Sequence, residues 1–225
     1  MLGESGHATL ISGQPLEKDA MRNLPLTICA AVALSIGAAH AEGLSVGGIV
    51  GATTWESGPK DERGLGAGVV ARYTVPVAEG VSLKAQVGAL LEGAEFGEAL
   101  SRSAAGSEEA LRAKGGIDWT LDALALVAAD LTARVTAYAG GGLSWARVEA
   151  SQRGTVVTDE VDVAFSDSES DTALGYKLVA GVEIPASERV TLFGQVEYAD
   201  YGDVDVTAFG NLASLGFRLG ALYRF

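Results

Sequence analysis

The feature that most constrains this chain is a repeated alternation of apolar and polar residues with a period of two. In residues 81–91, Val81, Leu83 and Val87 share one face of an extended strand, while Lys84 and Gln86 share the other. The alternation recurs in residues 44–55, 65–75, 81–91, 117–127, 131–145, 176–184, 190–198 and 215–225. Segments of about 9–11 residues are long enough to cross a bilayer at a tilt. The pattern predicts an all-β fold of eight strands.

The connections between these segments alternate in length. Short links at residues 77–80, 128–130 and 185–189 interleave with longer polar stretches near residues 56–64, 92–116, 148–173 and 200–210. Antiparallel membrane barrels show this asymmetry, with tight turns at one end and long loops at the other. We therefore expect an eight-stranded antiparallel transmembrane β-barrel with both strand termini at the end that carries the short turns.

Charged residues fall on the face opposite the aliphatic one. A soluble barrel would turn these charges outward, and the alternation alone is compatible with either arrangement. In a membrane barrel they face a lumen that is only just wide enough for side chains. Because an unpaired buried charge is costly, we expect them to pair as a plug rather than line a conducting path. The predicted lumen charge network is Arg72, Lys84, Glu92, Asp118, Asp122, Arg134, Lys177, Glu183, Glu197, Arg218 and Arg224.

Residues 21–41 have the three parts of a secretory signal peptide. Arg22 supplies the positive charge, residues 24–36 form the apolar middle, and Ala39-His40-Ala41 is a small-x-small cleavage site. A membrane anchor is the alternative, but its apolar run would need about 20 residues. We expect residues 1–20 to be an upstream extension from a misassigned start codon, and residues 42–225 to be the exported outer-membrane barrel.

The exported part would lack the side chains of many catalytic and metal sites. The only cysteine, Cys29, both histidines, His7 and His40, and both methionines, Met1 and Met21, precede residue 42. Disulfides, zinc sites and histidine-based catalysis are thereby excluded from residues 42–225. The formal net charge of -13 also disfavours a nucleic-acid partner. We expect no enzymatic activity, no cofactor and no metal.

Two further patterns allow a functional and a plainer interpretation. Oxygen ligands in the loop 148–173 could hold calcium, but they lack a twelve-residue calcium-loop pattern, and solvation is favoured. These acidic residues are Glu149, Asp159, Glu160, Asp162, Asp167, Glu169 and Asp171. Glycines at residues 64, 66 and 68 and at 140–142 look like phosphate-binding loops, yet no helix pattern follows them. We interpret them as relief of crowding inside a small barrel.

Three segments resemble the small outer-membrane β-barrel family that includes opacity-like surface antigens and the transmembrane domain of outer-membrane protein A. They are Ala137–Ser144, then Gly175–Glu183 with Gln195–Gly202, and the terminal Arg218-x-Gly220-x-x-Tyr223-x-Phe225. The resemblance implies eight antiparallel strands around a narrow interior in a Gram-negative envelope. It also implies that Arg218, Gly220, Tyr223 and Phe225 form the assembly signal read by the barrel-assembly machinery.

The function that we expect is non-enzymatic: a transmembrane surface antigen of the outer membrane with a structural role in envelope integrity and a largely plugged lumen. Its expected partners are outer-membrane lipid, lipopolysaccharide and the barrel-assembly machinery, with a host or environmental ligand on the loops as a further option. A porin-like protein with a narrow path for small solutes and a loop-based adhesin are the alternatives.

Overall fold

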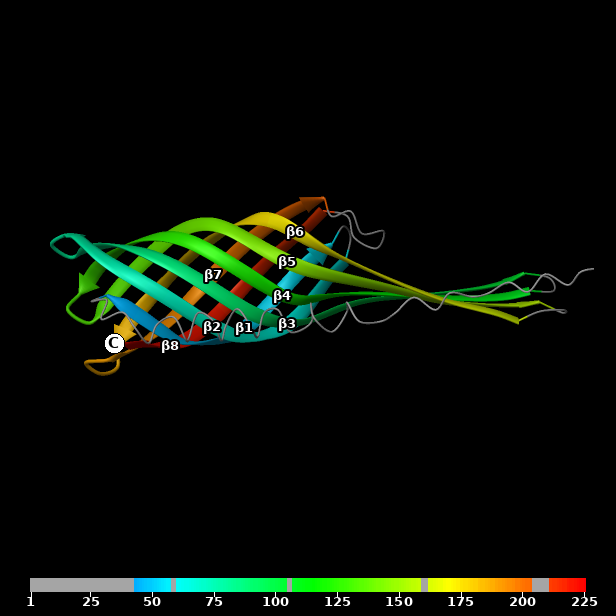
Figure 1. The fold of residues 1–225 in the computed structure, drawn as a ribbon, viewed down its shortest axis with the longest axis horizontal. Coiled ribbons are helices and arrows are strands. Elements are labelled where there is room, and N and C mark those ends of the chain that lie inside the picture. The colour runs from blue at the N-terminus through cyan, green and yellow to red at the C-terminus, as the bar shows by residue number, and fades with distance from the viewer. Residues whose placement is uncertain (1–42, 58–59, 105–106, 159–161, 204–210) are drawn as a thin grey trace, which may run out of the picture. The chain divides into compact units, whose positions relative to one another are not determined.

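The barrel is continuous around its whole circumference. The computed structural model describes residues 43–57, 60–104, 107–158, 162–203 and 211–225. Each strand pairs antiparallel with the next, and β1 also pairs with β8, so the ring closes (Figure 1). The strands are β1 (Leu44–Ser57), β2 (Lys60–Ala78), β3 (Val81–Ala104), β4 (Ser107–Thr132), β5 (Val135–Thr158), β6 (Asp162–Pro185), β7 (Val190–Asp203) and β8 (Asn211–Arg224). The predicted all-β, eight-stranded antiparallel barrel is confirmed.

The tight turns and both ends of the strand ring lie together at what we call the turn end of the barrel. Residues 79–80, 133–134 and 186–189 form these turns. The first strand and the chain terminus also meet there, because the backbone N–H of Phe225 donates to the carbonyl of Leu44 at 3.3 Å. Gly80 has a φ of 68°, a conformation that favours glycine in a tight turn. The opposite end is called the loop end below.

Several predicted boundaries were wrong. Residues 128–130 continue β4, and the turn lies at residues 133–134. The predicted loops 92–116 and 148–173 are largely strand, because β3, β4, β5 and β6 continue past the barrel rim as paired β-hairpins. A strand beyond the barrel wall does not separate lipid from a lumen, so its sequence is not required to alternate, and an alternation count misses it. The predicted signal peptide at 21–41 and the extension at 1–20 lie outside the described residues and stay predictions.

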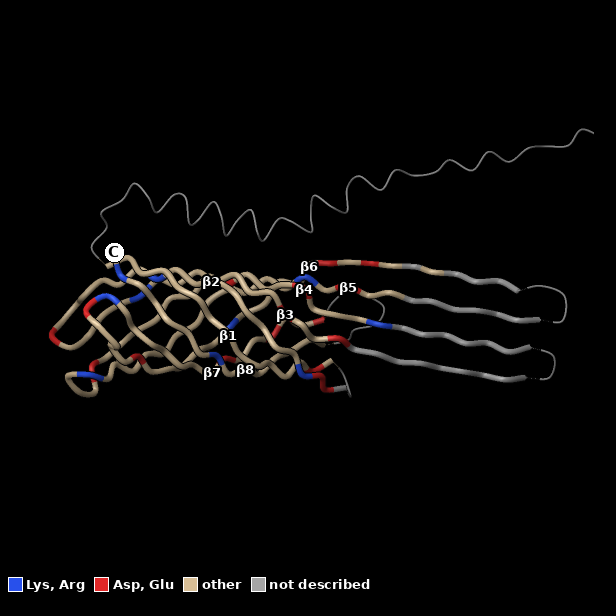
Figure 2. Tube along the Cα trace, turned by 90° about the horizontal axis from the view of Figure 1, so that it is seen from below, with Lys and Arg blue, Asp and Glu red and all other residues tan. Residues whose placement is uncertain are grey.

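The two faces of the wall have opposite character. Large apolar side chains point outward, as in Leu65, which is 77% exposed, and Val50, which is 57% exposed. Arg72 and Arg218, by contrast, point inward and are each 1% exposed. In Figure 2 most of the barrel trace is neutral, with Lys, Arg, Asp and Glu at scattered positions along it. A soluble barrel would bury the aliphatic face and expose the charges, which is the reverse of this arrangement. No helix able to cross a membrane occurs within the described ranges.

Candidate functional site: a charge network in the lumen

The turn-end half of the lumen is crossed by an ion pair between Arg72 on β2 and Glu183 on β6. These strands stand four places apart in a ring of eight, so the pair spans the interior. Lys84 Nζ contacts the second carboxylate oxygen of Glu183 at 2.6 Å, and Arg72 Nε donates to the amide oxygen of Gln86 at 3.0 Å. The Arg72 guanidinium also lies 4.8 Å from the ring centre of Tyr138. Together these five side chains form the turn-end cluster.

A second group of charges fills the middle of the lumen. Lys177 Nζ lies 2.8 Å from a carboxylate oxygen of Asp122 and 3.7 Å from one of Glu197. Arg218 Nε donates to the same Glu197 oxygen at 3.0 Å, and its Nη2 pairs with Glu92. The result is a chain of five alternating charges, contributed by β3, β4, β6, β7 and β8, which we call the central cluster.

Neutral polar side chains complete and join the two clusters. Tyr138 donates to the amide oxygen of Gln195 at 2.9 Å, and the amide nitrogen of Gln195 donates to Glu197 at 3.3 Å. Ser144 donates to Asp122 at 2.6 Å, while Arg218 Nη2 donates to the hydroxyl of Thr53 at 2.6 Å. The network is therefore continuous along the barrel.

The charges of the network balance. The buried cations are Arg72, Lys84, Lys177 and Arg218, and the buried anions are Glu92, Asp122, Glu183 and Glu197. Each of these side chains forms at least one ion pair with another member. Balance and direct pairing offset the cost of removing the charges from water.

Inward glycines make room for the largest lumen side chains. A Cβ atom on Gly181 would lie 2.6 Å from the Tyr138 hydroxyl, and one on Gly220 would collide with the Phe193 ring. Similarly, a Cβ on Gly66 would lie 2.7 Å from a carboxylate oxygen of Glu92. Real Cβ atoms do not approach other atoms so closely, so each glycine provides the space in which its neighbour lies. Gly66 is one of the glycines for which relief of crowding was predicted, and its contact agrees with that role.

Above the central cluster, the loop end of the lumen is apolar. The buried residues there include Trp55, Ile117, Val148 and Leu212, with small alanines between them. The Trp55 and Tyr201 rings stack with centroids 5.9 Å apart. Because the Tyr201 hydroxyl also hydrogen-bonds Ser144 at 2.8 Å, this apolar layer connects directly to the polar network beneath it.

Three residues of the predicted network lie elsewhere. Asp118 is exposed and sits 3.7 Å from Arg147. A β-bulge between Ile117 and Trp119 inserts one extra residue into β4. The alternation of inward and outward side chains therefore shifts by one position there, and Ile117 rather than Asp118 faces inward. Arg134 is exposed because it belongs to a turn rather than to a strand.

The third of these residues, Arg224, is exposed at the turn end, where its Nη2 donates to the carbonyl of Glu188. An alternation count cannot identify bulges or strand ends, which explains all three differences. It also gives no reason to choose the uncharged members, Thr53, Ser144, Tyr138, Gln195 and Tyr201. The only sequence feature that these residues share is an inward-facing position in the alternation of their strands.

The residues of the expected assembly signal separate into two environments. Tyr223 and Phe225 lie on the outer surface with ring centroids 5.4 Å apart. Arg218 belongs to the central cluster, and Gly220 lies against Phe193. In the closed barrel, only the two aromatic residues present side chains to the surroundings.

Metal binding has no preassembled site in the part of the chain that the structure describes. No group of three acidic, histidine or cysteine residues there has the proximity that a metal ion requires. Of the acidic loop, Glu149, Glu169 and Asp171 have exposed side chains. The remaining acidic residues of that loop have side chains outside the described set.

An apolar outer wall around a lumen of buried charge defines a transmembrane β-barrel of the outer-membrane class. Residues 26–225 match the family described as the outer membrane protein beta-barrel domain, and the chain belongs to this family. The protein is thus an outer-membrane protein.

Solved structures of small outer-membrane barrels are similar to this chain. Neisserial surface protein A is 17% identical, with 82% of this chain and 98% of that chain covered and a TM-score of 0.47. Ail of Yersinia pestis is 15% identical, with 82% and 99% covered and a TM-score of 0.46. OprG of Pseudomonas aeruginosa is 13% identical, with 83% and 97% covered and a TM-score of 0.40. The comparison with curated proteins finds no match.

Proposed function

We propose that this protein is a non-enzymatic outer-membrane surface protein whose largely plugged lumen serves envelope integrity. The observation that carries the proposal is the Arg72–Glu183 pair, which crosses the lumen between opposite walls. A solute would have to break this pair, then the central cluster, and then pass the stacked rings of Trp55 and Tyr201. Three successive barriers favour a structural barrel over a porin.

Single-channel recording tests the plugged lumen directly. Folded protein is reconstituted into planar bilayers, and the same sample is checked for heat-modifiable mobility on a gel to establish that it is folded. We expect no stable single-channel steps from the natural sequence. Stable, large steps in samples that contain only folded protein would refute the plugged lumen and favour the porin alternative.

If the natural sequence gives no current, a matched pair of variants shows whether the crossing ion pair is the reason. Replacing Arg72 and Glu183 together with serine removes one charge of each sign, so the lumen keeps its overall balance. It also opens the space between β2 and β6. We expect brief, small openings in this variant and none in a variant with the exposed Arg134 changed to serine. Equal conductance in both variants would contradict the assignment of the barrier to the crossing pair.

The proposed lack of catalytic activity is supported by how the polar groups are used. Each buried charge of the lumen is engaged in an ion pair, and residues 42–225 contain no histidine. Asp122 does accept a hydrogen bond from the Ser144 hydroxyl, but its other carboxylate oxygen pairs with Lys177 and both side chains are buried in the lumen, where a substrate would not reach them. Hydrolysis of phospholipid or peptide substrates above the rate of a heat-denatured sample would contradict this part of the proposal.

We also propose that the terminal strand is the segment read by the barrel-assembly machinery. Tyr223 and Phe225 support this role, since they lie on the outer surface, where another protein or lipid can contact them. Outer-membrane lipid and lipopolysaccharide are the proposed partners of the apolar wall.

Adhesion is a second candidate function, favoured by the extension of four strands past the rim. Pairing of β2 with β3 ends at Gly66 and Glu92, but β3 continues to pair with β4 as far as Ala104. On the other side, β6 pairs with β5 from residue 162 but meets β7 only from Tyr176. Within the described strands, both edges of this sheet therefore offer backbone groups to a further strand.

The chemistry of these edges limits the partner. The β6 edge carries Asp162, Asp167, Glu169 and Asp171, so an extended peptide with basic residues fits better than a polyanion. Ail has been solved with the heparin analogue sucrose octasulfate, a ligand of the opposite charge preference. Cells that display the full protein are compared with cells whose residues 96–113 and 152–165 are replaced by short turns. Equal adhesion to basic matrix peptides by both would exclude this candidate.

A further inference from the structure

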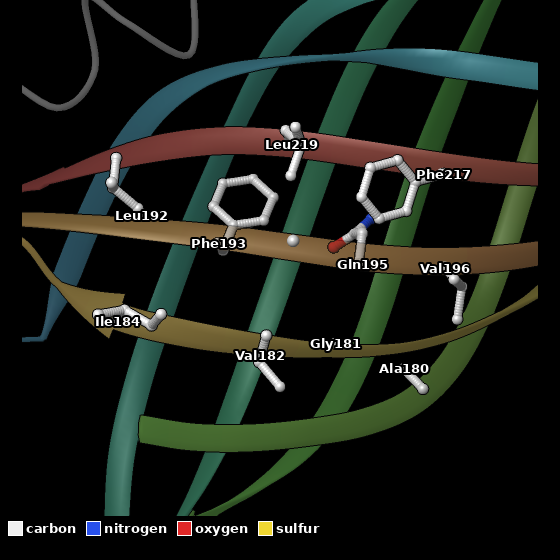
Figure 3. A pocket seen from close by; sticks show the side chains of 11 residues that line it. Ala180, Gly181, Val182, Ile184, Leu192, Phe193, Gln195, Val196, Phe217 and Leu219 are labelled. Atoms are coloured by element: carbon white, nitrogen blue, oxygen red, sulfur yellow. The ribbon is translucent and has the colours of Figure 1, made fainter. Parts of the chain in front are cut away.

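A groove of about 440 Å³ runs along the outer surface of β6, β7 and β8. It is an open depression of the outer surface rather than an enclosed cavity. Figure 3 shows the apolar side chains around it, with Phe217 and Leu219 on β8 and Val182 and Ile184 on β6. The groove exists because Gly194 takes an outward position between Leu192 and Val196 on β7. One side chain is thus missing from an otherwise continuous apolar wall.

The position of the groove along the barrel sets which part of the bilayer it faces. Short turns mark the periplasmic end of an outer-membrane barrel. Gly194 lies five residues beyond Arg189, the last residue of the turn between β6 and β7. At about 3.3 Å per residue this is about 16 Å along a tilted strand. Since the hydrocarbon core is about 30 Å thick, the groove faces the inner half of the bilayer.

Two arginines lie at the turn end of the same strand pair, five residues from Gly194 and Leu219 along the chain. The backbone N–H of Arg224 donates to the carbonyl of Arg189 at 2.8 Å, which holds the two residues side by side. Both side chains are exposed, and Arg189 Nη1 donates to the Tyr223 hydroxyl at 3.1 Å. Arg224 Nη2 donates to the backbone carbonyl of Glu188.

The guanidinium groups retain capacity for an anion. Among the described residues, neither guanidinium forms an ion pair with a carboxylate, although Glu188 belongs to the same turn. Arginine binds phosphate through several N–H groups at once. An apolar groove with two such cations further along the same strands matches a molecule with an anionic head and a long apolar tail.

We propose that the groove and these two arginines form a binding site for one anionic phospholipid of the inner leaflet. The phosphate contacts Arg189 and Arg224, and one acyl chain lies over Gly194 between Val182 and Leu219. A second copy of this chain could also cover the groove, but it would bring its own arginines against these two. Charge complementarity therefore favours the lipid.

Native mass spectrometry of the folded, full-length barrel in detergent tests the site. The protein is incubated with phosphatidylglycerol or with phosphatidylcholine of the same acyl chains, and bound lipids are counted. We expect one retained phosphatidylglycerol, and at least tenfold less retention of phosphatidylcholine at equal concentration. Equal retention of the two lipids would overturn the anionic site.

Two variants separate the groove from the head-group contact. Gly194→Leu fills the groove, and its Cβ would meet the flexible end of Leu219 at 3.2 Å and the carbonyl oxygen of Arg218 at 4.0 Å. We expect it to lower phosphatidylglycerol retention about tenfold, whereas Ala139→Leu on the outer face of β5 leaves retention unchanged. The double variant Arg189→Gln, Arg224→Gln should abolish the preference for phosphatidylglycerol.

Folding is checked for each variant by heat-modifiable mobility, so that a loss of binding is not a loss of structure. If Gly194→Leu fails to fold, the arginine double variant still decides the head-group contact and Gly194→Ala the groove. Unchanged lipid retention in a folded Gly194 variant would overturn the proposal. A dimer of the natural sequence that dissociates in Gly194→Leu would also overturn it, in favour of a contact between copies.

Discussion

Replacing Lys177 with methionine is the sharpest test of the central cluster. The Lys177 ammonium lies between two carboxylates, 2.8 Å from Asp122 and 3.7 Å from Glu197, and its side chain is 3% exposed. Both carboxylate side chains are 5% exposed. Methionine keeps the length of the side chain and removes only the charge and its hydrogen bonds. Two buried anions then face each other without the cation between them.

The expected loss follows from what remains. Removing one partner of a buried ion pair costs about 3–5 kcal/mol. Asp122 still accepts from Ser144, and Glu197 still pairs with Arg218, so the lower end of that range is expected. The free energy of unfolding is measured by urea titration of the barrel in lipid vesicles, with the folded fraction read from heat-modifiable mobility.

Two further variants make the result specific. Lys114→Met removes the same charge from a pair that is 3.9 Å apart and exposed by 58% and 81%, and it should cost at most about 1 kcal/mol. Adding Asp122→Asn to Lys177→Met removes one of the orphaned anions and should recover about half of the loss, because neighbouring sites are not additive. If Lys177→Met and Lys114→Met were equally mild, the central cluster would not be a buried, paired network.

Three other outcomes follow from the geometry. Asp118→Asn should change the free energy of unfolding by no more than about 0.5 kcal/mol, whereas Asp122→Asn should lower it by about 1–3 kcal/mol; the opposite order in urea titrations would contradict the bulge. Gly181→Ala should lower it by about 1–3 kcal/mol through collision with Tyr138, and an unchanged midpoint would show that the ring moves aside freely. Deleting Phe225 should reduce the yield of folded protein in the outer membrane, and a normal yield there would contradict the assembly role.

The sequence showed which side chains of a strand face inward and which face outward, because a barrel wall has lipid on one side and a polar lumen on the other. Arg72, Lys84 and Lys177 were all assigned to the inner face, where the structure places them. The same reasoning assigned Leu83 and Val87 to the outer face, where they lie. Each assignment depends only on counting by two within an unbroken strand.

What the sequence did not reveal depends on irregularities and on distance. The bulge beside Asp118 inserts one extra residue, so counting alternate residues along β4 gives the wrong face on one side of it. No residue type in the sequence marks the bulge. The hairpin extensions lie beyond the barrel wall, where nothing requires apolar and polar residues to alternate. The choice of partners was also hidden, since Arg72 and Glu183 are 111 residues apart and meet only when opposite walls are in place.

That separation has a consequence for how the barrel forms. The crossing pair joins β2 to β6, and Arg218 on the last strand joins Glu92 on the third. A sheet that has not closed would hold these charges without partners, in or near hydrocarbon. Bringing such distant residues together is entropically costly until the whole ring is assembled. Partly inserted sheets are thus the high-energy states of assembly, and ring closure and charge neutralisation are expected to occur as one cooperative step.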